Sequence, residues 1–369
     1  MGDCTMQIGV HLGYQNLHGM SDMEFFRKET QIAIEAEAMG FDFAAMVEHH
    51  FTDYAACPDP LQALSYVAAK TKTIKLMPAA VILPWNDPVR VVEKVAMLDS
   101  LSEGRVILGM GRGAARREFA GFRRDIADSR ELFDEACLII MDGLETGTVK
   151  ADTKHFQQPE VEIRPRPENW TRDRMLMVSM SPSSAEVAAE YGLKALRFSQ
   201  GDWSHSMAEI NAYRTTFEAN HGKQAPPFMI SDFVVCVDTE EEVGAYTDEY
   251  FAKQFYQVAN HYEWGGDHFK HMPSYATYVA LGDAMNAAGG PEKAYKAYIG
   301  GNLIGTPEQL IEKDAMRKAT VGNYDIIANF SYGGMSYDRV YDQMKRFADK
   351  VMPRLKQTGL KAKAVEPAL

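Results

Sequence analysis

Apolar and polar positions along this chain alternate in blocks that predict strands and helices in turn. Residues 6–12 and 41–47 are short apolar runs, which are typical of buried strands. Between them Ser21, followed three residues later by Glu24, forms a capping box, and apolar residues at helical spacing continue to Gly40. The strands predicted in this way cover residues 6–12, 41–47, 74–82, 106–110, 174–178, 193–198, 228–237 and 324–329.

Caps and prolines place helices between these strands. Asp87-Pro88 and Ser181-Pro182 each supply an N-cap followed by proline at the first helical position, and residues 306–309 form another capping box. The predicted helices cover residues 21–40, 60–70, 87–101, 126–144, 181–190, 206–220, a segment beginning at 306, and 337–355. About eight strand–helix pairs predict an α/β fold, a (β/α)8 TIM barrel with insertions.

Two segments interrupt the alternation. Residues 155–172 are polar and contain prolines, which indicates an excursion such as a hairpin. Residues 239–300 are rich in Tyr, His and Gly and contain no clear strand, so we interpret them as a helix plus an insertion that could act as a lid. We therefore predict a single domain over residues 1–360, with the insertion within 239–300, and a flexible tail at 361–369.

Composition and charge argue against several classes of protein. The chain is 46% hydrophobic, but no stretch approaches the roughly 20 apolar residues of a membrane span. A net charge of −12 disfavours nucleic acid and anionic membranes as partners, because both bind clustered Lys and Arg. The four cysteines lie far apart without a CxxC pair, which argues against disulfides and a zinc site, and no signal peptide is visible. We expect a cytoplasmic protein without a bound metal.

One candidate for catalysis is the loop that follows the second predicted strand, residues 48–52, which contains His49 and His50. Ligands of alternating α/β proteins bind at the carboxyl ends of the strands, and imidazole is suited to moving protons near neutral pH. A surface loop whose histidines only cap or hydrogen-bond is the alternative, and the doublet alone leaves both interpretations open.

A second candidate is an anion site at the turn before the helix at 182–190. A helix N-terminus presents unpaired N–H groups, and the hydroxyls of Ser181, Ser183 and Ser184 add donors. Arg112 could reach the same place if its strand lies nearby, which predicts a ligand that carries a phosphate. An ordinary capped helix and a surface arginine remain the alternative.

The loop at 111–117 and the end of the third strand offer small residues. Gly111 and Gly113 permit close approach of the backbone, although neither a dinucleotide fingerprint nor a P-loop lysine is present. Ala79-Ala80 could let a flat ring pack against the chain, or could mean only tight packing. The neighbouring arginines are more typical of a solvated face than of a binding patch; they are Arg116, Arg117, Arg123 and Arg124.

Taken together, these stretches resemble the bacterial luciferase-like family of flavin-dependent monooxygenases, and closely the luciferase α-subunit type. The matching stretches occur in the family's order and span nearly the whole chain: 40–42, 48–52, 79–84, 87–90, 104–105, 109–113, 181–186 and 351–353. The resemblance implies a barrel that binds reduced FMN (FMNH2) at the carboxyl ends of its strands, with a separate flavin reductase supplying it. It also implies a homodimer that pairs through helices beside the second and third strands.

By position, the resemblance carries several roles over to this sequence. His49 matches the catalytic histidine, Ala79-Ala80 matches a pair joined by a cis peptide under the flavin ring, and Arg112 with Ser181 and Ser184 matches the phosphate-binding positions. Two positions depart from luciferase. Met180 matches a glutamate near the phosphate, and Gly111 stands where luciferase has a reactive cysteine beside the flavin, which favours a monooxygenase without light output.

The resulting prediction is a two-component monooxygenase that uses FMNH2 and O2 to oxygenate a small or medium apolar substrate through a peroxyflavin. The expected flavin-site residues are Ala79, Ala80, Gly111, Arg112, Gly113, Met180, Ser181, Ser183 and Ser184, with His49 as the acid/base group. Two alternatives stay open. One is a deazaflavin-dependent oxidoreductase on the same barrel, and the other is a non-catalytic flavin-binding partner protein.

Overall fold

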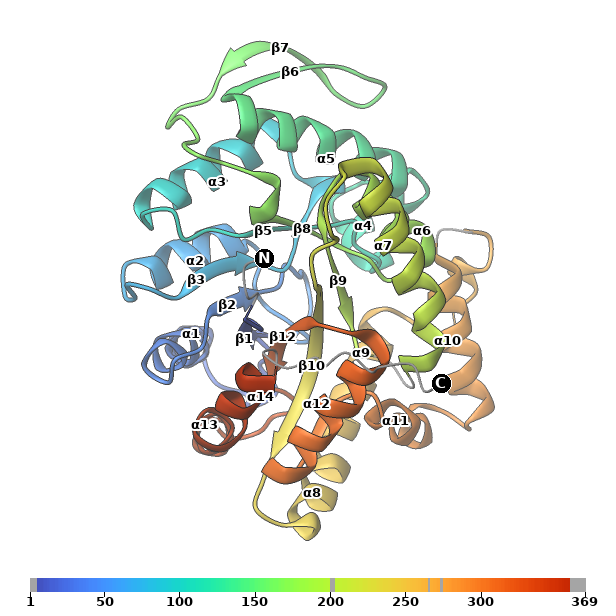
Figure 1. Ribbon diagram of the computed structural model, residues 1–369. Coiled ribbons are helices and arrows are strands. Elements are labelled where there is room, and N and C mark those ends of the chain that lie inside the picture. Colours follow the sequence, from blue (N-terminus) through green and yellow to red (C-terminus); the bar gives the residue numbers. More distant parts are fainter. Residues whose placement is uncertain (1–4, 200–202, 265, 273–274, 359–369) are drawn as a thin grey trace, which may run out of the picture.

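In the computed structural model, which describes residues 5–199, 203–264, 266–272 and 275–358, parallel strands form a barrel with helices around it (Figure 1). The predicted tail 361–369 lies outside the described residues. The barrel strands are β1 (Ile8–Leu12), β2 (Phe43–Met46), β3 (Lys75–Pro78), β4 (Val81–Ile82), β5 (Leu108–Gly111), β8 (Met175–Val178), β9 (Lys194–Phe198), β10 (Phe228–Cys236) and β12 (Tyr324–Asn329). The predicted fold class is therefore confirmed.

The third predicted strand, 74–82, is divided into β3 and β4. Ala79 and Ala80 lie between the two parts and are joined by a cis peptide bond, as the resemblance implies. β3 pairs with β2 on one side, whereas β4 pairs with β5 on the other. A parallel bridge between Leu76 and Val106 adds a second link across this edge, so the strands close around the barrel axis.

Helices follow the strands around the outside, and their caps are those that the sequence predicts. Ser21, Asp87, Ser181 and Thr306 each accept a hydrogen bond from the amide three residues further on. The helices are α1 (Asp22–Ala38), α2 (Pro60–Ala68), α3 (Pro88–Leu101), α4 (Arg116–Gly121), α5 (Ser129–Thr146), α6 (Pro182–Glu190), α7 (Met207–His221), α12 (Pro307–Val321), α13 (Tyr337–Arg346) and α14 (Met352–Thr358). A π-helical turn, Phe347–Val351, joins the last two, where the sequence predicts one continuous helix.

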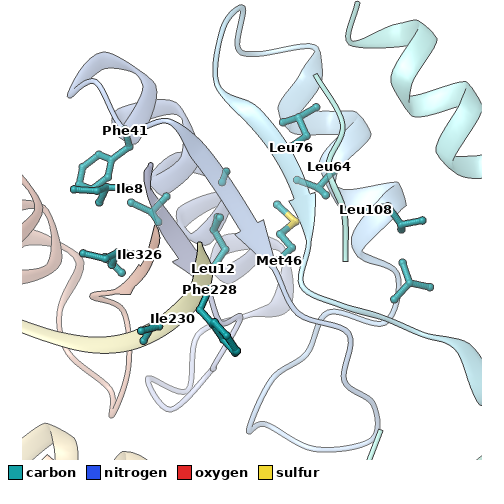
Figure 2. Packing of buried hydrophobic residues seen from close by; sticks show 14 of the residues in the cluster. Ile8, Leu12, Phe41, Met46, Leu64, Leu76, Leu108, Phe228, Ile230 and Ile326 are labelled. Carbon is teal, nitrogen blue, oxygen red and sulfur yellow. The ribbon is translucent and has the colours of Figure 1, made fainter. Parts of the chain in front are cut away.

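Alternate residues of each strand point outward to the helices and inward to the barrel axis. Figure 2 shows outward side chains such as Ile8, Met46 and Ile326, which share one buried cluster with Leu64 of α2. The inward set is a separate apolar cluster, with members Phe43, Ala45, Met77, Ala79, Leu176, Leu196, Met229 and Ile327. Because strand side chains repeat every second residue, the residues two positions further along reach the mouth of the barrel.

A hairpin outside the barrel, β6 (Thr148–Asp152) and β7 (Gln157–Glu162), runs along α5 (Figure 1). The sequence predicts a hairpin at 155–172, so its type is right and its position is too late by about seven residues. The reason is Gly147, whose left-handed φ of 76° ends α5 and begins β6 directly. The hairpin presents mostly exposed side chains and contributes nothing to the barrel mouth.

The insertion at 239–300 is helical and lies on one side of the barrel (Figure 1). It contains α8 (Glu240–Tyr246), a π-helical turn (Thr247–Phe251), α9 (Ala252–His261), α10 (Ala276–Ala287) and α11 (Pro291–Ile299). The short strand β11 (Leu303–Gly305), which the sequence does not predict, pairs with the end of β10. Within the described ranges, no helix has both the length and the apolar character needed to cross a bilayer.

Candidate active site

A cavity at the carboxyl ends of the strands collects nearly every residue that the sequence predicts for the site. His49 reaches it from the loop after β2, Gly111 from the end of β5, and Ser181 from the start of α6. Ala79, Ala80, Arg112, Gly113, Met180 and Ser184 also line it. Ser183 is the exception. Its side chain is exposed, and its hydroxyl lies 3.1 Å from that of Ser181 outside the lining.

One wall of the cavity is a flat apolar slot between Ala80, Gly111 and Val178. A methyl group built on Gly111 would lie 2.9 Å from Cδ1 of Ile82 and 3.1 Å from Cβ of Ala80. Those distances are shorter than ordinary van der Waals contact, so a side chain here would force the Ile82 side chain and Ala80 to shift. The slot therefore depends on glycine at this position, and a cysteine would not fit without movement.

The opposite end of the cavity gathers groups that bind an anion. Ser181 caps α6, and the half-buried guanidinium of Arg112 stacks on Tyr275 at 4.1 Å from the ring centroid. Arg130 of α5, which the sequence analysis did not select, donates from Nη2 to Oγ of Ser184 at 3.3 Å. Burial lowers the pKa of Arg112, although an arginine stays charged at neutral pH. Two guanidinium groups and a helix N-terminus together match a phosphate dianion.

His49 is held by a buried carboxylate. Its Nδ1 lies 3.0 Å from Oε1 of Glu118, which also accepts from the backbone amide of His50 at 2.8 Å and lies 3.5 Å from Nε2 of His261. Burial alone would raise the pKa of Glu118, but His49 and His261 beside it bring that pKa well below its ordinary value. A carboxylate only accepts hydrogen bonds, so Nδ1 of His49 donates.

The other imidazole nitrogen of His49 is directed at the cavity. Nε2 lies 3.3 Å from the hydroxyl of Tyr262, and the His49 side chain is 12% exposed. With Nδ1 committed to Glu118, Nε2 is the atom that can give a proton to a ligand or take one from it. The cluster of His49, Glu118 and His261 also offers three possible metal-ligand atoms within 4.8 Å of one another.

His50 has a structural place instead. Its Nε2 lies 3.3 Å from Oε1 of Glu48, and Glu48 accepts hydrogen bonds from the amide of Ile82, the indole of Trp85 and the side chain of Asn86. These bonds fasten the histidine loop to β4 and the turn after it. The structural interpretation of the doublet thus fits His50, whereas His49 faces the cavity.

The family model for luciferase-like monooxygenases matches residues 6–322 of this chain, which is well over half of its 369 residues. The chain belongs to the luciferase-like monooxygenase family. Among its curated relatives is the alkanal monooxygenase alpha chain of a Kryptophanaron alfredi symbiont, 27% identical over 349 residues, or 92% of this chain and 95% of the relative.

Solved structures share the barrel. The oxygenating constituent of 3,6-diketocamphane monooxygenase from Pseudomonas putida, described in complex with FMN, superposes with a TM-score of 0.73 at 18% identity, covering 95% of this chain and 98% of that one. An F420-dependent secondary alcohol dehydrogenase in complex with an F420-acetone adduct gives 0.69 at 16% identity, covering 95% and 99%. At these identities the likeness establishes the fold.

The luciferase-like site fits a flavin-type cofactor by its own chemistry. Ala79, Ala80, Gly111 and Val178 give one part of the cavity a small, apolar lining against which a flat ring could pack. The anion end supplies Arg112, Arg130 and the α6 N-terminus at the other side of the same cavity. A ring at one end and a phosphate at the other are features that FMN and a deazaflavin share.

Residues of the insertion complete the site, and the sequence analysis missed all of them. Tyr262, Tyr275 and Tyr278 line the cavity. Arg116 donates to Glu263 through Nε at 3.0 Å and Nη2 at 2.7 Å, and Arg117 donates to the carbonyl of Asn260 at 2.9 Å. These arginines are exposed or half-buried, as expected, but they also bind the insertion. The only feature of the sequence that could have pointed to these residues was the enrichment of residues 239–300 in Tyr and His.

Proposed function

We propose that this protein is the oxygenating component of a two-component system, an FMNH2-dependent monooxygenase acting on a small or medium apolar compound. The observation that carries the proposal is His49, whose Nδ1 is held by Glu118 at 3.0 Å while Nε2 faces a cavity with a ring slot and an anion end. Reduced FMN, when bound, would supply the electrons that activate O2. A separate reductase would deliver it, as the resemblance to the two-component flavin monooxygenases implies.

The residues of the chain would then do three things. Arg112, Arg130 and the start of α6 would bind the phosphate, and Ala79 with Ala80 would support the ring. Nε2 of His49 would hold or move a proton beside the ring. The insertion, through Tyr262 and its neighbours, would act as a lid that keeps water out of the cavity, because a dry site favours oxygenation over loss of oxygen as peroxide. The lid and a barrel domain over 1–360 are part of this proposal.

The deazaflavin oxidoreductase is the second candidate, supported by the F420-dependent alcohol dehydrogenase that shares the barrel. Both cofactors fit a slot with an anion end. The His49–Glu118 pair favours an enzyme over a non-catalytic flavin-binding partner, because a buried carboxylate that orients an imidazole toward a cavity is a costly arrangement for mere binding.

An anaerobic titration tests the proposal. We expect reduced FMN to bind at micromolar or lower concentration, and subsequent exposure to isotopically labelled O2 with a panel of ketones, aldehydes, terpenes and phenols to place one labelled oxygen atom in a product. Tight binding of a reduced deazaflavin, with hydride transfer to a ketone and no labelled product, would establish the second candidate instead.

We also propose the homodimer. Met97 and Leu101 lie one turn apart on α3 and are 47% and 63% exposed, an apolar surface on the helix beside the third strand. Light scattering should give twice the chain mass of 41.3 kDa, and a monomer mass at micromolar concentration would contradict the assignment.

A further inference from the structure

Two more cavities adjoin the flavin slot at the mouth of the barrel. Phe198 and Tyr262 line all three cavities, so they form a common partition. One of the two, which we call the aromatic chamber, lies between the barrel and the insertion. The other, which we call the polar subsite, lies over the barrel axis and includes His11, Ser231 and Asn329. A substrate that reaches the flavin ring would have to occupy these spaces.

The aromatic chamber is walled by rings from four parts of the chain. Tyr54 comes from the loop after β2, Phe198 from β9 and Phe233 from β10, and the insertion supplies the others: Phe251, Phe255, Tyr262, Trp264, Tyr278 and Tyr298. Many of these rings already meet edge to face, with centroids 5.7 Å apart for Phe255 and Trp264. Such rigid aromatic walls favour flat rings, which stack or meet edge to face, over a flexible alkyl chain.

The polar subsite follows from the alternation of the strands. Met229 and Ile327 point into the barrel, and the missing side chain of Gly9 would point at the inward ring of Phe43. His11, Ser231 and Asn329, two residues further along each strand, therefore form the floor of the mouth. Asn329 is only 5% exposed, and its Oδ1 makes no hydrogen bond of ordinary geometry among the described residues. The Asn329 side chain nevertheless lies near enough to His11 to raise the pKa of that imidazole against the effect of burial. Nδ1 of His11 is likewise buried without such a hydrogen bond. Buried polar atoms without a well-formed hydrogen bond at the floor of a cavity are places where an ordered water or a polar group of a ligand can bind.

The charge of that ligand is limited by the groups around it. Burial lowers the pKa of His11 to about 4, with His49 adding to the shift, so His11 is neutral at pH 7. The carboxylate that borders the subsite, Asp232, is held on both oxygens by Arg317 at 2.7 and 2.8 Å. A charged group on the ligand would therefore lose its hydration without gaining a partner of opposite charge.

Gln254 stands where the two cavities meet. Its Oε1 accepts from Gln15 at 2.6 Å, and Gln15 in turn accepts from the amide of Gly333 at 2.7 Å. Because its oxygen is committed to this chain of bonds, the NH2 group of Gln254 remains to donate to a ligand. Gln254 lines both the chamber and the subsite, so it can help to hold an oxygen atom at their junction.

We propose that the substrate is a neutral aromatic compound that carries a hydroxyl group, with its rings in the aromatic chamber and its hydroxyl on Asn329 and His11. A hydroxyl both donates and accepts, so it can satisfy Oδ1 of Asn329 and a nitrogen of His11 at once, whereas a carbonyl can only accept. This assignment deepens the proposed function and rests on it, because it names the substrate class of the same site.

The test is equilibrium dialysis with four probes: 2-naphthol, naphthalene, 2-naphthoate and decanal. We expect 2-naphthol to bind at least about tenfold more tightly than the other three, because the other probes leave a hydrogen bond of the buried subsite unmade or bring in a charge or a flexible chain. Equal binding of 2-naphthol and naphthalene, or tighter binding of decanal, would overturn the proposal. This comparison needs only the unaltered protein.

Two matched variants locate the effect. Asn329→Leu should weaken the binding of 2-naphthol about tenfold and leave the binding of naphthalene unchanged. Asn323 is exposed and precedes the other end of β12, so Asn323→Leu should change the binding of neither probe. If Asn329→Leu fails to fold, His11→Phe tests the same subsite. Repeating the dialysis with oxidised FMN separates the two proposals. If the protein does not bind FMN, the proposed function is contradicted. If it binds FMN but binds all four probes equally, only the substrate class is contradicted.

Discussion

The residue that organises the site is His49, and Glu118 decides what His49 can do. A carboxylate 3.0 Å from Nδ1 fixes the orientation of the imidazole and leaves Nε2 to act in the cavity. Glu118 is itself fixed by the amide of His50 at 2.8 Å. Glu118 lines the flavin cavity but neither of the two adjoining cavities, and its hydrogen bonds run to His49 and to the amide of His50, so we regard it as a positioning residue that acts through His49.

Glu118→Gln keeps the size of the side chain and removes its charge. We expect turnover to fall about ten- to hundredfold, part of the roughly 10²–10⁴ that general acid–base catalysis contributes. The dissociation constant of FMN should stay within about twofold, because Glu118 makes none of the proposed phosphate and ring contacts and the substitution keeps its size. Steady-state kinetics across pH would check this, and a profile identical to that of the unaltered protein would contradict the positioning role.

Glu118→Gln should also change how the stability of the fold depends on pH. The pKa of Glu118 is lower in the folded chain than its ordinary value of about 4.3, so its charge stabilises the fold fully above that pH and the contribution is lost as the pH falls. The melting temperatures of the unaltered protein and Glu118→Gln should therefore differ at pH 7, and the gap should shrink steadily as the pH falls below about 4. A gap that widens on acidification would have the wrong sign.

Gly111 gives a second prediction at this scale. Gly111→Ala should lower the free energy of unfolding by about 1–3 kcal/mol, because its methyl group would meet Ile82 and Ala80 at 2.9 and 3.1 Å. The same crowding of the cavity wall should weaken FMN binding about tenfold. Gly244→Ala is the matched control, since a methyl group there meets nothing within 4 Å and lies in α8. Denaturant unfolding and flavin titration measure both effects, and unchanged FMN binding in Gly111→Ala would remove this glycine from the slot.

Sequence reasoning found part of the site and missed part of it for a physical reason. Ser181 is recognisable because a cap and a following proline are local signals, and Arg112 could be paired with it once strand ends were aligned. Arg130 and Glu118 reach the cavity from helix faces, where an arginine or a glutamate looks like any solvated residue. Asn329 could have been found by counting two residues beyond the inward Ile327.

At the scale of elements, the strands and capped helices were predictable and the joints between them were not. Caps fix where α3, α6 and α12 begin, and period-two alternation fixes which residues of a strand face the axis. The break between β3 and β4, the π-helical turn before α14 and the three-residue β11 depend on tertiary contacts. The insertion shows no strand pattern because it is a set of helices whose rings pack on the barrel mouth.

A salt bridge between elements should help to hold that insertion. Arg116 of α4 and Glu263 after α9 form a bidentate pair at 3.0 and 2.7 Å. Reversing either charge alone should raise amide exchange in α9 about two- to fivefold, since an exposed pair contributes up to about 1 kcal/mol. The double variant Arg116→Glu with Glu263→Arg should restore protection.

Hydrogen exchange followed by mass spectrometry measures the protection of α9. The double variant is the control, because it replaces both side chains but keeps a pair of opposite charges. If it exchanges as fast as the two single variants, the pair does not hold the insertion in place, and the lid is fixed by the aromatic packing around Tyr262 instead.

At the scale of the whole molecule, the barrel brings distant segments to one mouth. β2 leads into the histidine loop, Ala79 and Ala80 lie between β3 and β4, β5 and α6 bring Arg112 and Ser181, and the insertion adds Tyr262, Tyr275 and Tyr278 to the same cavity. Figure 1 shows how these elements are arranged around the barrel. The family is established, whereas the use of FMNH2 and O2 by this chain is our proposal. Its central claim is that His49 makes oxygenation efficient within this enclosed mouth.

The most direct test is the yield of labelled product per reduced FMN consumed, measured under isotopically labelled O2 for the unaltered protein and for His49→Ala. The account predicts that the unaltered protein places one oxygen atom in the product for most of the reduced FMN used. His49→Ala should release at least about ten times more peroxide per product molecule while binding FMN with similar affinity. Equal yields from the two proteins would remove His49 from the mechanism, and no label in either would contradict the monooxygenase itself.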